Sequence, residues 1–340
     1  LAGASTALAC ALAGYGVWTL VYAPIAMFWT RAIGLTFVAR LLVWPSFNFK
    51  GCGQIIGFGS AILFSQLFWL VQSQSDIFIA GARFDAHALG LYAEALFLAQ
   101  IFMAKFVPPL NEVAFPAYAR IKTDAAAVRW SFLKTVRILM LVAAPFYCGL
   151  AVVAGPMIET LFGTKWLGMV PYIQLISLAL ILMTVQILFA PVTNALGKPS
   201  ISMFTAMSGA ILFPAAFLVG AQWGLIGMAW AWLIAAPLLL LVTARLSAPL
   251  IRVTLWDIAR AMLPGLAPAL VMAIGVGFAA EAIAPLGLAA PIRLAALVGL
   301  GVALYGALLW MLERDALAEV IRLVLRRQPP AADAPAQDAI

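Results

Sequence analysis

Residues 167–190 read LGMVPYIQLISLALILMTVQILFA, an uninterrupted run without a single Asp, Glu, Lys or Arg. A helix needs about 20 predominantly apolar residues to cross a hydrocarbon core that is ~30 Å thick. This stretch meets that length, and comparable runs, broken by charge, Pro or Gly, extend along the chain in both directions. We therefore predict ten membrane-spanning helices, the first of them shortened by the start of the sequence, at residues 1–14, 16–39, 53–75, 86–109, 130–153, 167–190, 199–220, 224–245, 263–283 and 290–312.

The composition of the whole chain leads to the same class. Of its 340 residues, 65% are hydrophobic and 10% are charged, against about 45–50% and 25% in soluble domains. The chain is thus predicted to be an all-α, polytopic membrane protein. Its net charge of +7 comes from basic residues that are scattered singly between apolar runs, which argues against nucleic-acid binding.

Cysteine and histidine give no sign of a metal or redox centre. Cys10, Cys52 and Cys148 lie far apart within apolar runs and are expected to pack as small hydrophobic residues. His87 is the only histidine, and a lone histidine does not supply the ligand set of a usual metal site. The sequence also has no Walker-type phosphate loop and no dinucleotide-binding glycine fingerprint. We therefore expect no cofactor, no bound metal and no enzymatic activity.

Lys and Arg are distributed unevenly between alternate connecting segments. Sixteen of the twenty fall on one side of the predicted membrane, Arg83, Lys165 and Arg293 fall on the other, and Lys105 lies within a span. Short loops rich in Lys and Arg stay in the cytoplasm. The richer side, which includes the C-terminus, is therefore predicted to be cytoplasmic, and the protein to lie in the bacterial inner membrane.

Three charged residues fall in or beside the fourth predicted span. Glu94, Lys105 and Glu112 are separated by eleven and seven residues, steps that at ~100° per residue keep them on one stripe of a helix. Charges within a bilayer are costly, so they usually face a cavity or a partner and mark function. Pro108 and Pro109 are expected to interrupt and bend the same helix, which predicts that it lines a water-filled cavity. Alternatively, Glu94 and Lys105 contact neighbours within the bundle or reach the headgroups, where Glu112 is expected.

A second polar group lies near the outer end of the preceding span. It consists of Gln66, Gln72, Gln74 and Asp76, followed by Arg83 and Asp85. We interpret this group as a solvated rim of the protein, in preference to a substrate contact.

Five strings, in order along the chain, carry a resemblance to a known family. They are ALAGYGVWTLV (residues 11–21), SDIFIAGARFDAHALGLYAEA (75–95), NEVAFPAYARI (111–121), LFGTKW (161–166) and NALGKPSISM (194–203). The second string, with an Asp, a Gly and then Leu-Gly-x-Tyr, is the most specific. Over residues 1 to about 245 the sequence resembles the bacterial oligosaccharide flippases of the polysaccharide-transporter family. Among these it is most similar to the Wzx-type lipopolysaccharide and exopolysaccharide exporters.

The resemblance also implies an organisation of the chain. The family belongs to the multidrug, oligosaccharidyl-lipid and polysaccharide exporter superfamily, whose members have two six-helix lobes and often two additional C-terminal helices. Residues 1–48 would then end an incomplete first lobe, 49–246 would form the second lobe, and 247–312 the additional pair. About four helices of a roughly fourteen-helix fold would precede this sequence, which is expected to be N-terminally truncated. Residues 313–327 alternate apolar and charged residues, which predicts an amphipathic helix, and 328–340 are expected to be a disordered tail.

In function, the resemblance implies a flippase that moves oligosaccharide repeat units, linked through pyrophosphate to undecaprenol, across the inner membrane for lipopolysaccharide or exopolysaccharide synthesis. Membrane lipids and the polymerase and chain-length proteins of polysaccharide assembly are its implied partners. An anionic, polar headgroup needs a hydrated cavity with cations, which makes Lys105 the candidate contact for the pyrophosphate. Arg83 is the candidate on the outer side, and Glu94 the candidate for coupling to a proton gradient.

Three other functions are left open by the sequence. A drug and toxin antiporter of the same superfamily would favour carboxylates over a deep lysine. A membrane polymerase or ligase typically has a large periplasmic loop, whereas the loops predicted on that side are short. A lipid-binding scaffold in an envelope assembly is the third alternative.

Overall fold

The computed structural model describes residues 2–39 and 53–312. The predicted amphipathic helix 313–327 and the predicted tail 328–340 lie outside the described residues. The chain divides into two compact units, Leu1–Gly53 and Gln54–Ile340.

The first unit is a helical hairpin. Its helices α1 (Ala2–Leu12) and α2 (Thr19–Val38) pack against each other and are joined through a short 3-10 turn, η1 (Gly16–Trp18). Gly14 and Gly16 have φ angles of 79° and 52°. Glycine adopts these left-handed conformations without steric cost, so the two residues allow the chain to reverse its direction.

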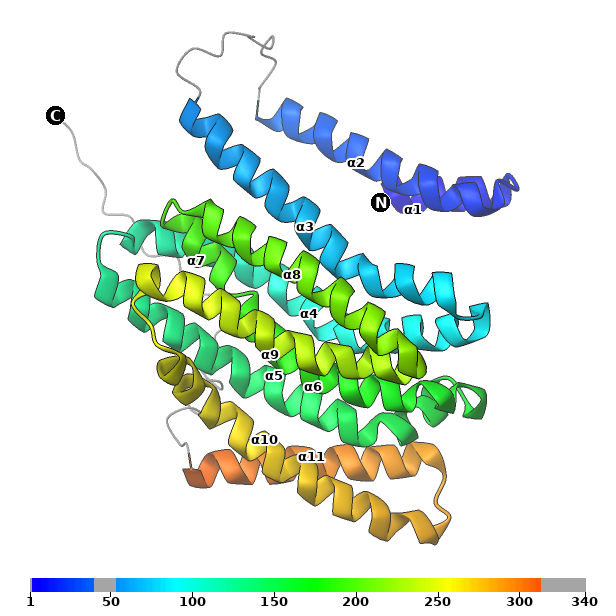
Figure 1. The fold of residues 1–340 in the computed structure, drawn as a ribbon. Coiled ribbons are helices and arrows are strands. Elements are labelled where there is room, and N and C mark those ends of the chain that lie inside the picture. The colour runs from blue at the N-terminus through cyan, green and yellow to red at the C-terminus, as the bar shows by residue number, and fades with distance from the viewer. Residues whose placement is uncertain (1, 40–52, 313–340) are drawn as a thin grey trace, which may run out of the picture. The chain divides into compact units, whose positions relative to one another are not determined.

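The second unit is a bundle of helices (Figure 1). In chain order they are α3 (Gly53–Arg83), α4 (Ala86–Ile121), α5 (Ala125–Leu161), α6 (Val170–Gln186), α7 (Phe189–Ala195), α8 (Pro199–Gly220), α9 (Gly224–Ile251), α10 (Leu255–Ile283) and α11 (Ala290–Leu312). The 3-10 turns η2 (Thr164–Met169), η3 (Ala221–Trp223) and η4 (Ala284–Leu286) lie between some of them. Neither described range, 2–39 or 53–312, contains a strand, which confirms the predicted all-α fold.

Eight segments of the described chain are long and apolar enough to cross a membrane. One of them, Pro199–Ile251, contains both α8 and α9, because the 3-10 turn η3 joins these helices without an intervening loop. Helix α1, with 11 residues, is shorter than a span. Each of the ten predicted intervals nevertheless contains a helix, and the chain is a polytopic membrane protein, as predicted.

Helices α3, α4 and α5 are longer than predicted, with 31, 36 and 37 residues. At ~1.5 Å per residue, each exceeds the ~30 Å hydrocarbon core, so their ends extend into the headgroup layers. Asp85 and Asp124 cap the starts of α4 and α5, each accepting hydrogen bonds from two backbone N–H groups of the first turn. The hydrogen bonds from the backbone of Ala88 and His87 hold the pKa of the Asp85 carboxyl below its ordinary value.

The interior of the second unit is formed by close packing of helices. Helix α5 packs against α6, α10 and α11, and α9 packs against α6 and α8. Glycine brings α8 and α9 together, since a Cβ atom on Gly227 would lie 2.1 Å from the carbonyl oxygen of Gly220. Phe132, Met140 and Tyr147 of α5 are fully buried in this core.

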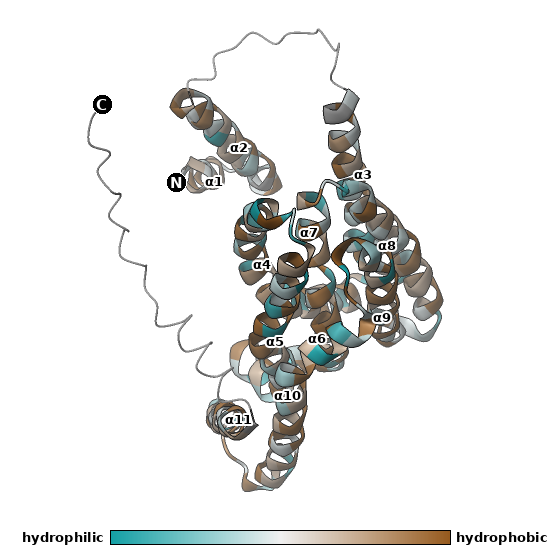
Figure 2. Ribbon diagram, turned by 90° about the vertical axis from the view of Figure 1, so that its left-hand side faces the viewer, coloured by the Kyte–Doolittle hydropathy of each residue, from teal (hydrophilic) through white to brown (hydrophobic). Residues whose placement is uncertain are grey.

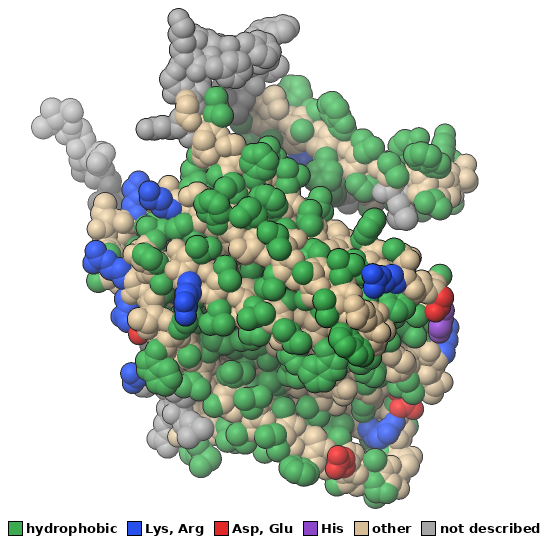
Figure 3. Space-filling model, viewed as in Figure 1, with side chains coloured by type: hydrophobic (Ala, Val, Ile, Leu, Met, Phe, Trp, Pro, Cys, Tyr) green, Lys and Arg blue, Asp and Glu red, His purple; other side chains and the backbone are tan. Residues whose placement is uncertain are grey.

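Large hydrophobic side chains also cover the outside of the second unit. Phe78, Trp230 and Ile274 are 79%, 50% and 61% exposed. Figure 2 shows hydrophobic residues along the lengths of the helices, and Figure 3 shows hydrophobic side chains over much of the visible face. Such a surface would be unfavourable in water, whereas lipid tails solvate it, as a membrane location requires.

Two side-chain contacts join helix α11 to α5. Near its start, Arg293 forms an ion pair with Glu159, close to the end of α5. Further along, the hydroxyl of Tyr305 donates a hydrogen bond to the carbonyl oxygen of Leu141 at 2.8 Å. Helices α10 and α11 are therefore both attached to the bundle through their contacts with α5.

Candidate functional site

Helix α3 faces the rest of its unit with one narrow stripe. Ala61, Gln72, Asp76 and Ile79 are buried, whereas most of the helix is exposed. Gln72 and Asp76 are 6% and 0% exposed, so their interpretation as part of a solvated rim is wrong. Because they are four residues apart, one helical turn places both on the same inward face. Gln74, on the other side of the helix, is exposed.

Asp76 belongs to a chain of hydrogen bonds that joins three helices. Its Oδ1 accepts from the backbone N–H of Ile77 at 2.8 Å, and its Oδ2 accepts from the Tyr92 hydroxyl of α4 at 3.4 Å. Trp232 of α9 donates from Nε1 to the Tyr92 oxygen at 3.1 Å. Tyr92 and Trp232 are themselves buried. A buried ionisable side chain within a spanning helix is costly, which makes Asp76 a candidate functional group.

Gln72 lies one turn before Asp76 and contacts α8. Position 209 of α8 is a glycine, and a Cβ atom there would lie 1.9 Å from the Gln72 Oε1. The sequence shows a polar pair four residues apart in an apolar stretch, and that spacing was the available signal for an inward-facing stripe. The sequence did not reveal the hydrogen-bonding partners of this stripe, because Tyr92 is 16 residues from Asp76 and Trp232 is 140 residues from Tyr92.

A pocket of about 290 Å³ lies between α3, α4, α7 and α8. It is lined by Ile62, Ser65, Gln66, Asn111, Phe115, Ala190, Pro191, Asn194, Pro199 and Ser202. The Ser202 hydroxyl donates to Asn194 Oδ1 at 3.0 Å and lies 2.8 Å from the Thr193 hydroxyl. The Oδ1 of Asn111 is buried without a hydrogen-bond partner among the described residues. The described lining is therefore uncharged, with amide and hydroxyl groups among apolar side chains.

The three predicted site residues, Arg83, Glu94 and Lys105, do not form one cluster. Arg83 is exposed at the end of α3, Glu94 is half-buried in α4, and Lys105 is exposed near the middle of α4. Glu94 and Lys105 are eleven residues apart, which is about 16 Å along a helix. Both lie on a less buried side of α4 than Tyr92 and Phe102. Their functional roles remain predictions.

Helix α4 is not interrupted at Pro108 and Pro109, contrary to expectation, since it runs from Ala86 to Ile121. A proline has no N–H group to donate to the carbonyl four residues earlier. The carbonyl groups of Ala104 and Lys105 therefore lack their helical hydrogen bonds. These two carbonyl groups lie on the same helical turn as the Lys105 side chain, in the middle of a spanning helix.

Together, these features define what the site can do chemically. The Asp76 network offers a carboxyl group that can take up and release a proton, and the pocket offers amide and hydroxyl groups to a polar ligand. Within residues 2–39 and 53–312, no group of three or more His, Cys, Asp and Glu residues is placed to hold a metal ion.

Two relatives are similar to much of the chain. The teichuronic acid biosynthesis protein TuaB of Bacillus subtilis is 28% identical over 210 residues, which are 62% of this chain and 44% of that protein. The succinoglycan biosynthesis transport protein ExoT of Rhizobium meliloti is 24% identical over 99% of this chain and 68% of its own length.

A third relative is the lipopolysaccharide biosynthesis protein WzxC of Escherichia coli, which is 24% identical over 60% of this chain and 42% of its own length. The chain thus spans less than half the length of two of these curated relatives and about two thirds of the third.

The fold is also similar to a solved structure, the lipid II flippase MurJ in an inward closed conformation. The TM-score is 0.65, with 13% sequence identity, and the match covers 93% of this chain and 67% of that one. At this identity the likeness concerns the fold. The family itself is shown by the sequence: residues 1–171 match the family described as "Polysaccharide biosynthesis protein". The chain therefore belongs to the polysaccharide biosynthesis protein family.

Proposed function

We propose that the whole protein is a flippase that translocates undecaprenyl-pyrophosphate-linked oligosaccharide repeat units across the inner membrane, for lipopolysaccharide or exopolysaccharide synthesis. The family match over residues 1–171 carries this proposal. Three relatives named for teichuronic acid, succinoglycan and lipopolysaccharide biosynthesis support it. The fold of a lipid II flippase adds support from an independent comparison.

The second unit contains polar groups suited to such a cargo. A sugar presents hydroxyl groups that both donate and accept hydrogen bonds, and the uncharged pocket around Asn111 and Asn194 offers matching amides. The pyrophosphate carries negative charge, for which we propose Lys105 as the contact, since its ammonium is exposed in the middle of a span. Arg83, exposed at the end of α3, would meet the headgroup on the outer side.

A gradient-driven flippase also needs a group that couples transport to an ion. Glu94 is one proposed coupling residue, and its half-buried position on α4 leaves part of it at the surface of the unit. Asp76 is the second, and its complete burial supports a coupling role, because loss of a proton there changes the charge of a hydrogen-bonded network. The two carboxylates make separate predictions, which variants can distinguish.

The organisation of the whole protein follows the same proposal. Residues 1–48 would end a first lobe, 49–246 would form the second lobe, and 247–312 would be two added helices. The protein would lie in the inner membrane with its C-terminus in the cytoplasm, because the basic residues are concentrated on that side. It would work as a transporter and not as an enzyme, beside the polymerase and chain-length proteins of polysaccharide assembly.

Reconstitution of the full-length protein tests the transport activity. Proteoliposomes would contain the lipid-linked oligosaccharide, with an impermeant glycosidase outside to report the outer leaflet. We expect nearly complete digestion with active protein and about half with empty liposomes, where only the outer leaflet is accessible. Equal digestion in both preparations would contradict the proposal. Export of a cationic drug by the same proteoliposomes would instead favour the antiporter.

A further inference from the structure

The pocket around Asn111 contains a polar atom that its own surroundings do not satisfy. Asn111 is half-buried on α4, and its Oδ1 lacks a hydrogen-bond partner among residues 2–39 and 53–312. Most buried polar atoms in proteins have a partner, because a buried acceptor without a donor costs free energy. A ligand that brings an N–H or O–H group to this oxygen would remove that cost.

The amide of Asn111 can turn toward the pocket that the residue lines. The terminal torsion of an asparagine has two broad orientations, and the oxygen and nitrogen ends of the amide have nearly the same shape. A half-turn of the amide therefore exchanges acceptor and donor with little other movement. The acceptor that is buried without a partner is thus available to a ligand in the pocket.

Asn194 of α7, in the same lining, complements this acceptor with a donor. Its Oδ1 accepts from the Ser202 hydroxyl at 3.0 Å, and that hydroxyl also lies 2.8 Å from the Thr193 hydroxyl. Since the side-chain oxygen of Asn194 is engaged, its NH2 group is the end that a ligand can use. The pocket therefore combines an acceptor from α4 with a donor from α7.

The turn between α7 and α8 holds Asn194 in place. Gly197 has a φ angle of 76°, a left-handed conformation that glycine adopts without steric cost. Its N–H donates to the carbonyl oxygen of Asn194 at 3.0 Å, and the N–H of Lys198 donates to that of Thr193 at 2.9 Å. Because both the backbone and the side chain of Asn194 are fixed, less entropy is lost when a ligand binds.

Apolar side chains complete the lining and limit the size of the ligand. They belong to Ile62, Phe115, Ala190, Pro191 and Pro199. The volume of about 290 Å³ is at the lower end of ligand pockets, which begin at ~300 Å³, and is about ten times the ~30 Å³ of a water molecule. The pocket therefore has room for one sugar residue with its substituents.

On the basis of the proposed flippase function, we propose that this pocket binds a sugar of the cargo that carries an N-acetyl group. The acetamido N–H would donate to Asn111 Oδ1, and the acetamido carbonyl would accept from the NH2 group of Asn194. The methyl group would contact Ile62 and Phe115. A sugar hydroxyl offers its donor and acceptor from one atom, whereas an acetamido group offers them from two atoms on opposite sides, as amides from two different helices require.

The test compares two lipids that differ at one position of the sugar, undecaprenyl-pyrophosphoryl-N-acetylglucosamine and undecaprenyl-pyrophosphoryl-glucose. Native mass spectrometry of the full-length purified protein measures the ratio of their dissociation constants. Both lipids share the polyprenyl chain and the pyrophosphate, so any contribution of Lys105 cancels in this ratio. Asn111→Leu removes the acceptor, and Asn194→Asp keeps an acceptor for Ser202 but has no NH2 group.

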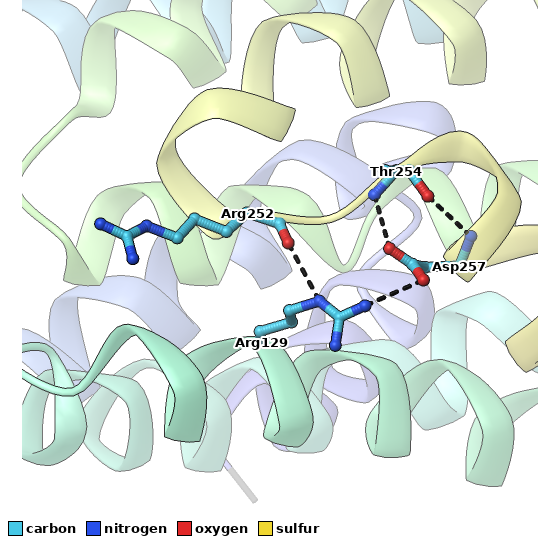
Figure 4. Close-up of polar contacts among 4 residues, drawn as sticks. All are labelled: Arg129, Arg252, Thr254 and Asp257. Atoms are coloured by element: carbon cyan, nitrogen blue, oxygen red, sulfur yellow. Dashed lines mark hydrogen bonds and ion pairs between the residues drawn. The ribbon is translucent and has the colours of Figure 1, made fainter.

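Two variants outside the pocket serve as controls. Gln74→Leu removes an exposed amide of α3. Arg129→Gln disturbs the fold elsewhere: Figure 4 shows Arg129 of α5 donating from Nε to the carbonyl oxygen of Arg252 at 3.0 Å and from Nη2 to Asp257 at 2.9 Å. Both controls should keep the wild-type ratio, and Arg129→Gln shows whether a lower melting temperature by itself changes it.

We expect wild type to bind the N-acetylglucosamine lipid about tenfold more tightly than the glucose lipid, the usual contribution of one or two hydrogen bonds. Each pocket variant should lose most of this preference. Because Asn111 Oδ1 has no partner among the described residues, Asn111→Leu should melt no lower than wild type.

Equal binding of the two lipids by wild type, an unchanged preference in both pocket variants, or an equal loss in Gln74→Leu would overturn the proposal. Transport of both lipids in the glycosidase assay separates this result from the flippase function. Equal binding with transport of both lipids would overturn the role of the pocket and leave the flippase standing. A preference that depends on Asn111, without transport of either lipid, would support the pocket and contradict the flippase.

Discussion

Among single residues, Asp76 has the most unusual environment. Its carboxyl group is fully buried within a spanning helix, and it accepts hydrogen bonds from the Ile77 backbone and the Tyr92 hydroxyl. Tyr92 in turn accepts from Trp232. If Asp76 loses its proton, the hydrogen bonds from the Tyr92 hydroxyl and the Ile77 N–H stabilise the negative charge of its carboxylate. If it gains one, the carboxyl becomes a donor and the network must rearrange, which is the kind of change a coupling site requires.

Substitution of Asp76 separates folding from coupling. Asp76→Asn keeps an acceptor for Tyr92 but cannot ionise, so we expect a melting temperature close to wild type and loss of gradient-driven transport. Asp76→Leu leaves the buried Tyr92 hydroxyl without its acceptor, at a cost of about 1–3 kcal/mol. Thermal unfolding in detergent and transport in proteoliposomes measure the two effects. Full transport by Asp76→Asn would assign the residue to structure alone, and Glu94→Gln would then be the test of coupling.

Lys105 makes a different prediction, because its ammonium is exposed and its loss should leave the fold unaffected. Lys105→Ala should reduce transport about tenfold or more, as expected for loss of one charge-assisted hydrogen bond to the pyrophosphate. Lys105→Arg retains the charge and should keep most of the activity, and Lys122→Ala serves as a control outside the span. Transport is measured at limiting cargo concentration. Unchanged transport by Lys105→Ala would remove Lys105 from the cargo site.

Sequence patterns predicted which charged residues lie within the spans, but not which residues surround them. The stripe of Glu94 and Lys105 follows from helical periodicity, and both residues do lie on a less buried side of α4. The burial of Asp76 was missed, because a polar residue near the end of an apolar run is compatible with a solvated rim. Its burial depends on Tyr92 and Trp232, which only the packing of α3, α4 and α9 brings together.

Among the helices, α5 and α10 can approach closely because residue 265 of α10 is a glycine, which has no side chain. Gly265→Ala would place a Cβ atom 2.5 Å from the backbone of Met140, so the helices must separate, at a cost of about 1–3 kcal/mol. Gly277→Ala, in the same helix, is the matched control, since its Cβ would meet nothing within 4 Å. Thermal unfolding of the two variants in detergent should show a lower melting temperature for Gly265→Ala alone. Equal melting temperatures would mean that α10 is not held at this crossing.

The positions of the helices were predictable, whereas their ends were less so. Apolar runs gave an interval for each described helix except α7, most of which follows the predicted span 167–190, because hydrocarbon requires each backbone group to bond within its own helix. The runs did not show that α4 continues past Pro108 and Pro109 or that α5 begins at Ala125. In these regions the helix extends through charged and proline-containing sequence, where hydropathy has no signal, and the cap at Asp124 sets the start of α5.

For the molecule as a whole, the distribution of basic residues predicts the orientation. A green fluorescent protein fused after residue 340 should fluoresce, because it folds in the cytoplasm, and alkaline phosphatase at the same position should be inactive. Cysteines introduced at Lys122 and Lys165 provide an independent measurement, since only Lys165→Cys should react with an impermeant thiol reagent in intact spheroplasts. Labelling of Lys122→Cys alone would reverse the predicted topology.

Transport of a lipid-linked oligosaccharide is tested most directly in the cell. The measurement is mass spectrometry of undecaprenyl-linked intermediates after clean deletion of the full-length gene, with surface polysaccharide quantified in parallel. A flippase predicts that completed lipid-linked repeat units accumulate while surface polymer disappears, and that the wild-type gene restores both. Unchanged intermediates and polymer, with new sensitivity to cationic drugs, would contradict the flippase and support the antiporter.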